Sequence, residues 1–436
     1  MRRAAFHTLG CKVNAYETEA MEQLLEQAGY EIVPFKEGAD AYIINTCSVT
    51  AVSDKKCRNM IRRTRRDHPD AIVAVCGCYA QAKPEDITAL GVDLVAGTGD
   101  RLAFLDRLER QSVRPDAPSV SVDDALRRHD FEVLPAGGLS GRTRAMLKVE
   151  DGCSNFCTYC IIPFTRGPVR SASIPAAVAQ TKALAEAGYH EIVLTGIEIS
   201  SWGEDLGAGQ TLIDLVEAVC HAAPTLRIRL GSLEPRTITA EFCRRAAQLD
   251  NLCPHFHLAL QSGCDATLKR MNRKYTAGRF LDSCRLLRQF FDRPAITTDL
   301  ICGFAGETEE EFAATLDLIQ QADFAAMHIF PYSRRSGTVA DRLPDQLPNA
   351  VKEARCHAAA EVARKMEARY LDSWIGETLP VLFEEQVEGR WHGHAPNYAE
   401  VFWSALPEEQ EQNLHNTVKS VHITGRSGRA LEGVIL

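Results

Sequence analysis

Residues 142–330 repeat a strand–helix unit about six times, and this repeat limits the possible folds more than any other feature. The apolar runs that predict strands are A-M-L-K-V, E-I-V-L-T-G, R-I-R-L-G-S-L, H-F-H-L-A-L, A-I-T-T-D-L-I and M-H-I-F-P. Helical patterns such as Pro175–Ala187, Leu212–Ala222 and Glu309–Gln321 lie between them. Strands that alternate with helices form parallel sheets. The repeat therefore predicts an open, partial (β/α)6 barrel, short of the eight units of a closed barrel.

The segments on either side of this repeat have different patterns. The first hundred residues place the strand candidates A-A-F-H-T-L, A-Y-I-I-N, A-I-V-A-V-C and D-L-V-A-G around helices predicted over Asn14–Ala28 and Ser48–Arg66. This alternation predicts a doubly wound parallel sheet. After a helix predicted over Val351–Leu371, short alternating runs beyond Trp374 predict a small β-barrel. The fold class is therefore α/β, with an all-β end.

The same patterns divide the chain into four segments. A length of 436 residues exceeds what one core usually supports. We predict an N-terminal domain over 1–110, a linker over 111–138, the partial barrel over 139–370 and the small β-barrel over 371–436. The glycine-rich stretch P-A-G-G-L-S-G (135–141) is predicted to be a loop.

Composition and charge exclude some classes of protein. No run of about 18 apolar residues occurs, so no membrane span is predicted. The N-terminus, M-R-R-A-A-F-H-T-L-G-C, lacks the apolar stretch of a signal peptide, so we predict a cytoplasmic protein. In that compartment the fifteen cysteines are not expected to form disulfides. The net charge of −9 gives no support to a nucleic-acid partner, although Arg62, Arg63, Arg65 and Arg66 are clustered.

The stretch D-G-C-S-N-F-C-T-Y-C (151–160) places Cys153, Cys157 and Cys160 directly after the first barrel strand. Three thiolates on one loop can hold three irons of a [4Fe–4S] cluster and leave the fourth iron open. An open iron can bind S-adenosylmethionine, whereas a cluster that only carries electrons usually has four protein ligands. A zinc loop is the alternative. It fits poorly, because zinc usually takes four ligands, often from paired C-x2-C halves.

Three further cysteines follow strands of the N-terminal segment. Cys11 follows the first strand, Cys47 follows the second, and the pair Cys76 and Cys78 ends the third. Parallel strands present their carboxyl ends at one edge of a sheet, so these thiols predict a second cluster with an open iron. Cys76 belongs to the apolar run, and Cys78 is the first side chain past Gly77, so Cys78 is predicted as the third ligand. The alternative is that all of them are buried core residues.

Four stretches resemble the motifs of the radical S-adenosylmethionine methylthiotransferases. They are T-L-G-C-K-V-N, N-T-C-S-V-T, G-C-Y-A-Q and C-S-N-F-C-T-Y-C-I-I-P-F-T-R-G. The resemblance covers nearly the whole chain outside roughly 101–140. It implies a cluster domain, a radical barrel and a C-terminal TRAM domain. It also implies cofactor-binding roles for residues at later strand ends and beside the cysteine loop: Tyr159, Gly196, Glu198, Ser232, Glu234, Gln261 and Asp299.

Within this family, T-L-G-C-K-V-N looks most like the branch that acts on N6-threonylcarbamoyladenosine at position 37 of tRNA. The resemblance implies two [4Fe–4S] clusters and S-adenosylmethionine. One cluster would cleave S-adenosylmethionine to a radical that activates C2 of the adenine, and the other would carry the sulfur that is methylated and inserted. Other branches act on isopentenyladenosine in tRNA or on a ribosomal-protein aspartate. Sulfur insertion into a small molecule and a non-catalytic metal-cluster RNA-binding protein also remain as alternatives.

The implied partners are the anticodon loop of tRNA and an electron donor such as flavodoxin or ferredoxin, with the enzyme a monomer. Single-stranded loops can present a splayed base, and small barrels often bind such strands. Candidate RNA contacts in the last domain are Trp391, His392, His394, Phe402, Trp403, Lys419, Arg426 and Arg429. For Phe402 a core position is the preferred interpretation. The arginine cluster at 62–66 is either a solvated helix face or an RNA contact, and Arg334 and Arg335 are expected to face the barrel mouth.

Overall fold

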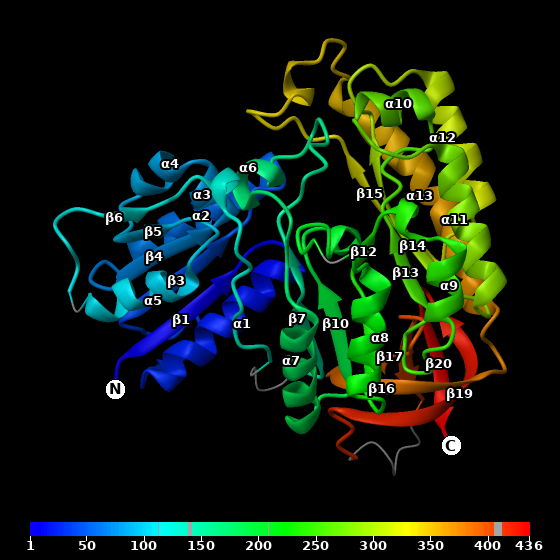
Figure 1. Cartoon of the computed structure of the whole chain (residues 1–436), viewed down its shortest axis with the longest axis horizontal. Coiled ribbons are helices and arrows are strands. Elements are labelled where there is room, and N and C mark those ends of the chain that lie inside the picture. The colour runs from blue at the N-terminus through cyan, green and yellow to red at the C-terminus, as the bar shows by residue number, and fades with distance from the viewer. Residues whose placement is uncertain (112, 138–141, 208, 405–411) are drawn as a thin grey trace.

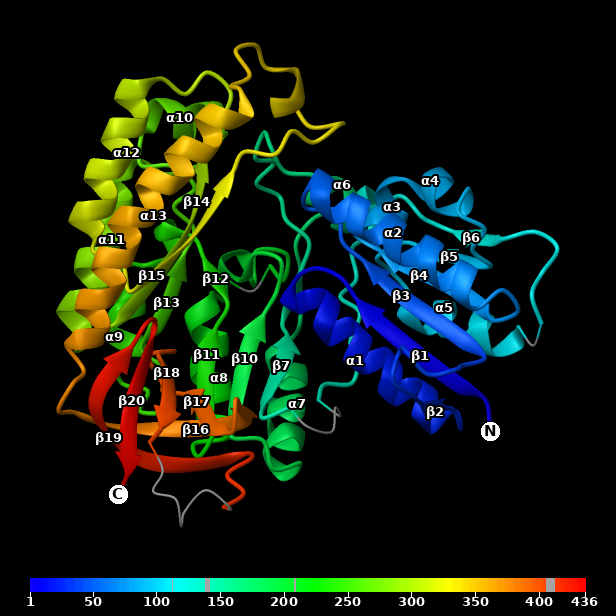
Figure 2. The same cartoon turned by 180° about the vertical axis from the view of Figure 1, so that it is seen from behind.

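The computed structural model describes residues 1–111, 113–137, 142–207, 209–404 and 412–436. An N-terminal sheet domain lies beside an open barrel, and a closed β-barrel lies below the open one (Figures 1 and 2). Residues 138–141 of the predicted linker loop lie outside the described residues. Within the ranges described, no helix is both long and apolar enough to cross a membrane.

The N-terminal sheet has six parallel strands in the order β2-β1-β3-β4-β5-β6. They are β1 (Arg3–Thr8), β2 (Glu31–Ile32), β3 (Ala41–Thr46), β4 (Ile72–Gly77), β5 (Leu94–Ala96) and β6 (Ser119–Ser121). Strand β6 comes from the segment predicted as a linker, where a 3-10 turn, η1 (Ala125–Arg127), also lies. The predicted sheet therefore gains an edge strand from that segment.

Helices cover both faces of this sheet, so the doubly wound prediction is confirmed. One face packs on α1 (Lys12–Gln27) and α5 (Arg101–Arg110). The other packs on α2 (Ala51–Asp67), α3 (Cys78–Ala82) and α4 (Pro84–Thr88). The Thr50 side chain begins α2 by accepting a hydrogen bond from the Ser53 N–H, as an N-cap does.

The open barrel has the six strand positions that the sequence predicts. They are β7 (Arg144–Lys148), β10 (Glu191–Thr195), β11 with β12 (Arg227–Leu230, Ser232–Leu233), β13 (His255–Leu258), β14 (Ala295–Cys302) and β15 (Ala326–Pro331). All neighbouring pairs among them are parallel. A short antiparallel pair, β8 (Glu150–Asp151) with β9 (Arg170–Ser171), follows β7. The partial (β/α)6 architecture is confirmed.

Helices follow the barrel strands and bury one large apolar core against them. They are α6 (Ile162–Arg166), α7 (Ile174–Glu186), α8 (Leu212–Ala222), α9 (Ala240–Ala246), α10 (Asp265–Arg270), α11 (Ala277–Phe290), α12 (Glu309–Ala322) and α13 (Asn349–Asp372), with 3-10 turns η2 (Ile199–Ser201), η3 (Pro235–Thr237) and η4 (Ala340–Arg342). The first strand, β7, lies next to α1 of the N-terminal domain in both views (Figures 1 and 2).

The last domain is a closed barrel, as predicted, with the strand order β16-β17-β18-β20-β19. The strands are β16 (Thr378–Val387), β17 (Arg390–His394), β18 (Glu400–Trp403), β19 (Thr417–Ser427) and β20 (Ala430–Ile435). Closure removes the open edges of a five-stranded sheet. This barrel has its own apolar core, which includes Trp374 from the segment that leads into it.

Candidate functional site

Two of the predicted ligands follow neighbouring strand ends. The register pair Thr46 and Gly77 is the last in the β3–β4 ladder, and Cys47 and Cys78 come next along the chain. Strand β1 lies on the other side of β3, and its end leads to Cys11. Strand order reverses between β1 and β3, and open α/β sheets bind ligands at such switch points. The structure therefore brings the three predicted thiols to one edge of the sheet.

Two glycines permit this close approach. Gly10 has a φ of +121°, and a Cβ there would come within 2.7 Å of the Cys47 Cβ. Gly77 has a φ of +98°, and its Cβ would come within 2.4 Å of the Thr46 carbonyl oxygen. Side chains other than hydrogen are excluded at both positions. The loops that carry Cys11 and Cys78 can approach the end of β3 only with glycine there.

The thiols at this edge affect one another electrostatically. Burial raises the pKa of Cys78 to about 11; the Arg166 guanidinium opposes this, and the Cys11 and Cys47 thiols add to it. Burial also raises the pKa of Cys47, and Cys11 adds to that shift. A cysteine thiol must lose its proton to bind metal, so a bound cation would have to displace these protons.

The two other cysteines of this domain face the core. Cys76 lies within β4, is completely buried, and packs in the apolar cluster beneath α1 and α5. Cys57 lies on α2, where its thiol donates a hydrogen bond to the Cys47 carbonyl oxygen at 3.4 Å. Alternation along a strand would place residues 76 and 78 on the same face, but β4 ends at Gly77 and Cys78 begins α3, so only Cys78 has left the strand.

The loop with Cys153, Cys157 and Cys160 is fixed at both ends. The Cys153 N–H donates to the Gly167 carbonyl oxygen at 2.9 Å, and the Cys160 N–H donates to the Cys157 carbonyl oxygen at 2.9 Å. Gly152, with a φ of +91°, approaches so closely that a Cβ would lie 1.9 Å from the Pro168 carbonyl oxygen. The backbone therefore holds the loop against the turn that follows α6.

This loop lines a cavity of about 160 Å³ at the carboxyl ends of the barrel strands. Five residues predicted to bind the cofactor also line it: Tyr159, Glu198, Ser232, Glu234 and Gln261. The other two do not. Gly196 lies directly after β10, where a Cβ would come within 2.6 Å of a Glu150 carboxylate oxygen, and Asp299 forms an ion pair with His257 at 3.4 Å.

Arg273 also lines this cavity, although no sequence motif indicates it. Its Nη1 donates to the Cys157 sulfur at 3.2 Å, and its Nη2 lies 2.8 Å from a Glu234 carboxylate oxygen. The guanidinium also lies over the Tyr275 ring, 4.9 Å from the centroid. The stretch M-N-R-K-Y has no spacing that indicates a site, so only the tertiary structure reveals this residue.

The polar groups of the cavity suit a ligand that carries both charges. Burial, followed by the negative charge of Glu234, raises the pKa of Glu198 to about 7. The Arg273 Nη2 is buried and lies 2.8 Å from a Glu234 carboxylate oxygen, but it meets no hydrogen-bond geometry within the described residues. A positively charged group would stabilise the Glu198 carboxylate, and a ligand carboxylate could accept the hydrogen bond that Glu234 does not accept from Arg273. The amino acid end of S-adenosylmethionine has both groups, so the residues present fit this cofactor.

The donor set at both cysteine groups is also suitable for iron. Thiolates are the usual ligands of iron–sulfur clusters. Among the residues that the structure describes, no group of three or more His, Cys, Asp or Glu side chains is arranged to hold a metal ion. The assignment of Cys11, Cys47, Cys78, Cys153, Cys157 and Cys160 as ligands therefore stays a prediction.

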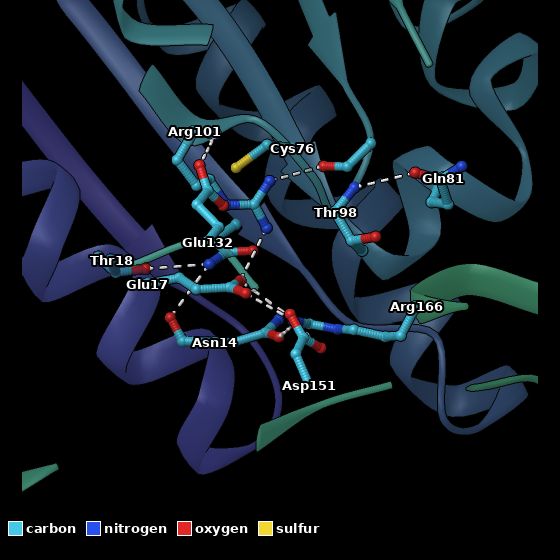
Figure 3. Close-up of polar contacts among 12 residues, drawn as sticks. Asn14, Glu17, Thr18, Cys76, Gln81, Thr98, Arg101, Glu132, Asp151 and Arg166 are labelled. Atoms are coloured by element: carbon cyan, nitrogen blue, oxygen red, sulfur yellow. Dashed lines mark hydrogen bonds and ion pairs between the residues drawn. The ribbon is translucent and has the colours of Figure 1, made fainter. Parts of the chain in front are cut away.

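A buried ion network joins the two cysteine regions (Figure 3). Arg166 of α6 donates to Glu17 of α1 at 2.5 Å and to Asn14 at 2.8 Å, and its Nη1 lies 3.3 Å from Asp151. Arg101 of α5 donates to the other Glu17 oxygen at 2.7 Å. The Glu17, Arg101 and Arg166 side chains are fully buried. This network ties the N-terminal sheet to the turn after the cysteine loop.

Arg166 also acts on the first cysteine group. Its positive charge opposes the rise in the pKa of Cys78 that burial causes. The pKa of Arg166 is itself raised, against burial, by Glu17 and Asp151 and further by the Cys78 and Cys11 thiols. Asp151 lies two residues before Cys153 and contacts the same guanidinium. One arginine therefore lies between the two candidate ligand sets.

Two arginines that the sequence analysis singled out, one expected at the barrel mouth and one in the 62–66 cluster, have partners within the protein. Arg335 is buried, forms an ion pair with Asp54 at 2.5 Å, and contacts Ser48. It joins the loop after β15 to the N-terminal domain, so the expectation that it faces the open mouth is wrong. Arg65 is bonded to Asp93 and to neighbouring carbonyl oxygens, so it stabilises the end of α2.

The aromatic residues of the last barrel are divided between its core and its outer surface, and Phe402 lies on the side that was not predicted. Trp391 and Trp403 are core residues, and Phe402 is only partly buried. Phe402 stacks on His392 with centroids 5.3 Å apart, and the Arg390 guanidinium lies 4.7 Å from its ring centroid. Alternation along β18 turns Trp403 inward and Phe402 outward, so the core position predicted for Phe402 is wrong.

Comparison with known families covers both major domains. Residues 3–97 match the uncharacterized protein family UPF0004, and residues 147–319 match the Radical SAM superfamily. In solved structures, the chain resembles the radical S-adenosylmethionine methyltransferase TsrM from Kitasatospora setae. The TM-score is 0.56 and the identity 16%, over 76% of this chain and 75% of that one. At that identity the likeness shows the fold.

Curated relatives are much more similar. The chain is 42% identical to the threonylcarbamoyladenosine tRNA methylthiotransferase MtaB of Bacillus subtilis, over 94% of this chain and 92% of the relative. It is 35% identical to MtaB of Thermotoga maritima, over 88% and 87%. It is also 34% identical to a tRNA-2-methylthio-N(6)-dimethylallyladenosine synthase of a Thermoanaerobacter species, over 86% and 81%. These similarities confirm the resemblance seen in the motifs, and the chain belongs to the radical S-adenosylmethionine methylthiotransferase family.

Proposed function

We propose that this transferase installs a methylthio group at C2 of N6-threonylcarbamoyladenosine at position 37 of tRNA. The observation that carries the proposal is the convergence of Cys11, Cys47 and Cys78 at one sheet edge, joined through Arg166 to the Cys153–Cys160 loop. Two sets of three thiols on one rigid framework suit a reaction that needs both a radical source and a sulfur source. The 42% identity to a threonylcarbamoyladenosine enzyme supports the substrate.

In this proposal each cysteine group holds one [4Fe–4S] cluster with an iron left open. Bound at these sites, the clusters would supply the radical chemistry, with S-adenosylmethionine, and the sulfur. The chain's own residues bind and orient. Glu198 and Arg273 would hold the two charged groups of S-adenosylmethionine, and Tyr159 would pack beside its adenine. Gly196 has no side chain that could collide with the Glu150 carboxylate at the end of β10.

For tRNA binding we propose the outer surface of the last barrel, where the partly buried Phe402 ring lies between the Arg390 guanidinium and the buried His392 ring. Aromatic and guanidinium faces stack on single-stranded bases without strong sequence preference. We further propose that the enzyme works as a cytoplasmic monomer and takes electrons from a flavodoxin or ferredoxin.

A second candidate substrate is dimethylallyladenosine, because relatives of that name are 34% identical over 86% of this chain. The two substrates differ in charge. The threonylcarbamoyl group carries a carboxylate, and the dimethylallyl group is uncharged and apolar. The charges around the substrate site therefore bear directly on this choice.

The proposed function is tested by nucleoside mass spectrometry of tRNA from a strain that lacks the gene. The 2-methylthio derivative of N6-threonylcarbamoyladenosine should disappear, the unmodified precursor should accumulate, and the wild-type gene should restore the product. Unchanged 2-methylthio-N6-threonylcarbamoyladenosine, with loss of the dimethylallyl derivative instead, would assign the second substrate.

The pair Cys76 and Cys78 offers a matched test of the first cluster. Cys78→Ala should reduce the iron of anaerobically reconstituted protein by about four atoms per chain, because the sheet edge loses one of three ligands. Cys76→Ala should keep its iron, because that side chain lies in the apolar core. Iron analysis and visible absorption measure both. The opposite pattern, with iron lost from Cys76→Ala alone, would show that Cys76 is the ligand and Cys78 is not.

A further inference from the structure

A second cavity, of about 250 Å³, lies where all three domains meet. Its lining includes Lys12 from the start of α1, Arg144 and Met146 from β7, and Arg229 from β11. The last domain contributes Glu384 of β16 and Tyr398. The cavity thus opens onto the strand face of the partial barrel, next to the helix that begins at Cys11.

The three arginines that line this cavity are already neutralised. Arg144 forms an ion pair with Glu384 at 2.9 Å, Arg229 forms one with Glu191 at 2.6 Å, and Arg142 forms one with Glu19 at 2.7 Å. The Arg144 and Arg229 guanidiniums also lie over the Tyr398 ring, 5.1 and 4.6 Å from its centroid. These contacts fix the arginines as walls of the cavity and leave them little free charge for a ligand.

Lys12 differs from these arginines. Its side chain forms no hydrogen bond or ion pair with any residue that the structure describes, and it is exposed, so a ligand can reach it. It is the first residue of α1, where the helix dipole disfavours a cation. Arg229 and Arg144 line the same cavity. A bound anion would offset the unfavourable interaction of the Lys12 cation with the helix dipole.

We propose that Lys12 binds the carboxylate of the substituent on the target adenosine and so selects an anionic substrate. This inference rests on the proposed function and identifies the residue that recognises the substituent of the substrate. Lys12 is adjacent to Cys11, a proposed ligand of the sulfur-carrying cluster. In adenine, C2 is joined to C6 through N1 alone, so a substituent at N6 and the reacting carbon lie on one edge of the ring. Holding the substituent at Lys12 therefore places C2 near Cys11.

The test compares binding of anticodon stem-loop RNAs to the anaerobically reconstituted full-length protein by fluorescence anisotropy. The RNAs carry N6-threonylcarbamoyladenosine, dimethylallyladenosine or plain adenosine at position 37. Lys12→Gln should weaken binding of the threonylcarbamoyl RNA by about tenfold, the effect of losing one hydrogen bond to a charged group, and leave the other two unchanged. Lys12→Arg should retain most of the preference, and Lys12→Glu should reverse it. Lys36→Gln, at an exposed lysine of the N-terminal domain, is the control.

Three results would overturn the inference. Equal weakening for all three RNAs would show that Lys12 binds a backbone phosphate, which is the other anion in the substrate. Unchanged binding of the threonylcarbamoyl RNA by Lys12→Gln would show that Lys12 does not recognise the substrate. Loss of iron in both Lys12→Gln and Lys12→Arg would show that Lys12 instead helps to position Cys11. If the wild-type protein itself does not prefer the threonylcarbamoyl RNA, the proposed substrate fails instead, which is a distinguishable result.

Discussion

Cys157→Ala is expected to abolish methylthiolation, with a loss of more than about a thousandfold, because in the proposed mechanism the cluster held by this loop supplies the radical chemistry. The loop would keep only two thiols, and iron in reconstituted protein should fall by about four atoms per chain. Arg273 would lose its contact with the Cys157 sulfur. Iron analysis, formation of 5′-deoxyadenosine from S-adenosylmethionine, and mass spectrometry of tRNA measure the effect.

Cys264→Ala provides the matched control. Cys264 is partly exposed, precedes α10, and its side chain makes no capping hydrogen bond. Its replacement should leave iron content and product formation unchanged. Full iron and normal product in Cys157→Ala would remove the cysteine loop from the cluster assignment. RNA binding should be the same in both variants, since neither changes the outer surface of the last barrel.

Glu17→Gln is expected to lower the free energy of unfolding by about 3 to 5 kcal/mol, because it leaves buried cations without their central partner. Arg101, Arg166 and Lys148 all lie within ion-pair distance of the Glu17 carboxylate. Calorimetry of wild-type and variant protein measures the difference. Glu26→Gln, at an exposed position on the same helix, should change stability little.

The effect of Glu17→Gln should also depend on pH in a defined direction. Burial alone would raise the pKa of Glu17, but the charges of Arg101, Arg166 and Lys148 outweigh burial and lower it. A carboxyl whose pKa is lowered by folding stabilises the protein above its unfolded pKa and loses that contribution as pH falls. The difference in the free energy of unfolding between wild type and variant should therefore be constant above about pH 4.5 and become smaller below it. If this difference in unfolding free energy grew as the pH fell, the stabilising role of the Glu17 ion pairs would be contradicted.

The fold was predictable because its signals are local. Alternating apolar runs and helical periods identified the six barrel positions, the doubly wound sheet and the closed last barrel. Gly77 marked the end of β4, and so separated Cys78 from Cys76. The edge strand β6 was missed, since Ser119–Ser121 has only three residues and no apolar run. Phe402 was placed wrongly, because the phase of β18 relative to the core is set by pairing with β17 and β20.

The sequence by itself determined the order of the domains, the family, and the cysteines that follow strand ends. All of these follow from short motifs and from periods of two or 3.6 residues. Only the tertiary structure decided which charges meet. Arg166 contacts Glu17 across 149 residues, Arg335 contacts Asp54 across 281, and Lys12 lines the same cavity as Arg229. Such contacts depend on how separate elements pack, and no local pattern encodes the distance between side chains so far apart in the chain.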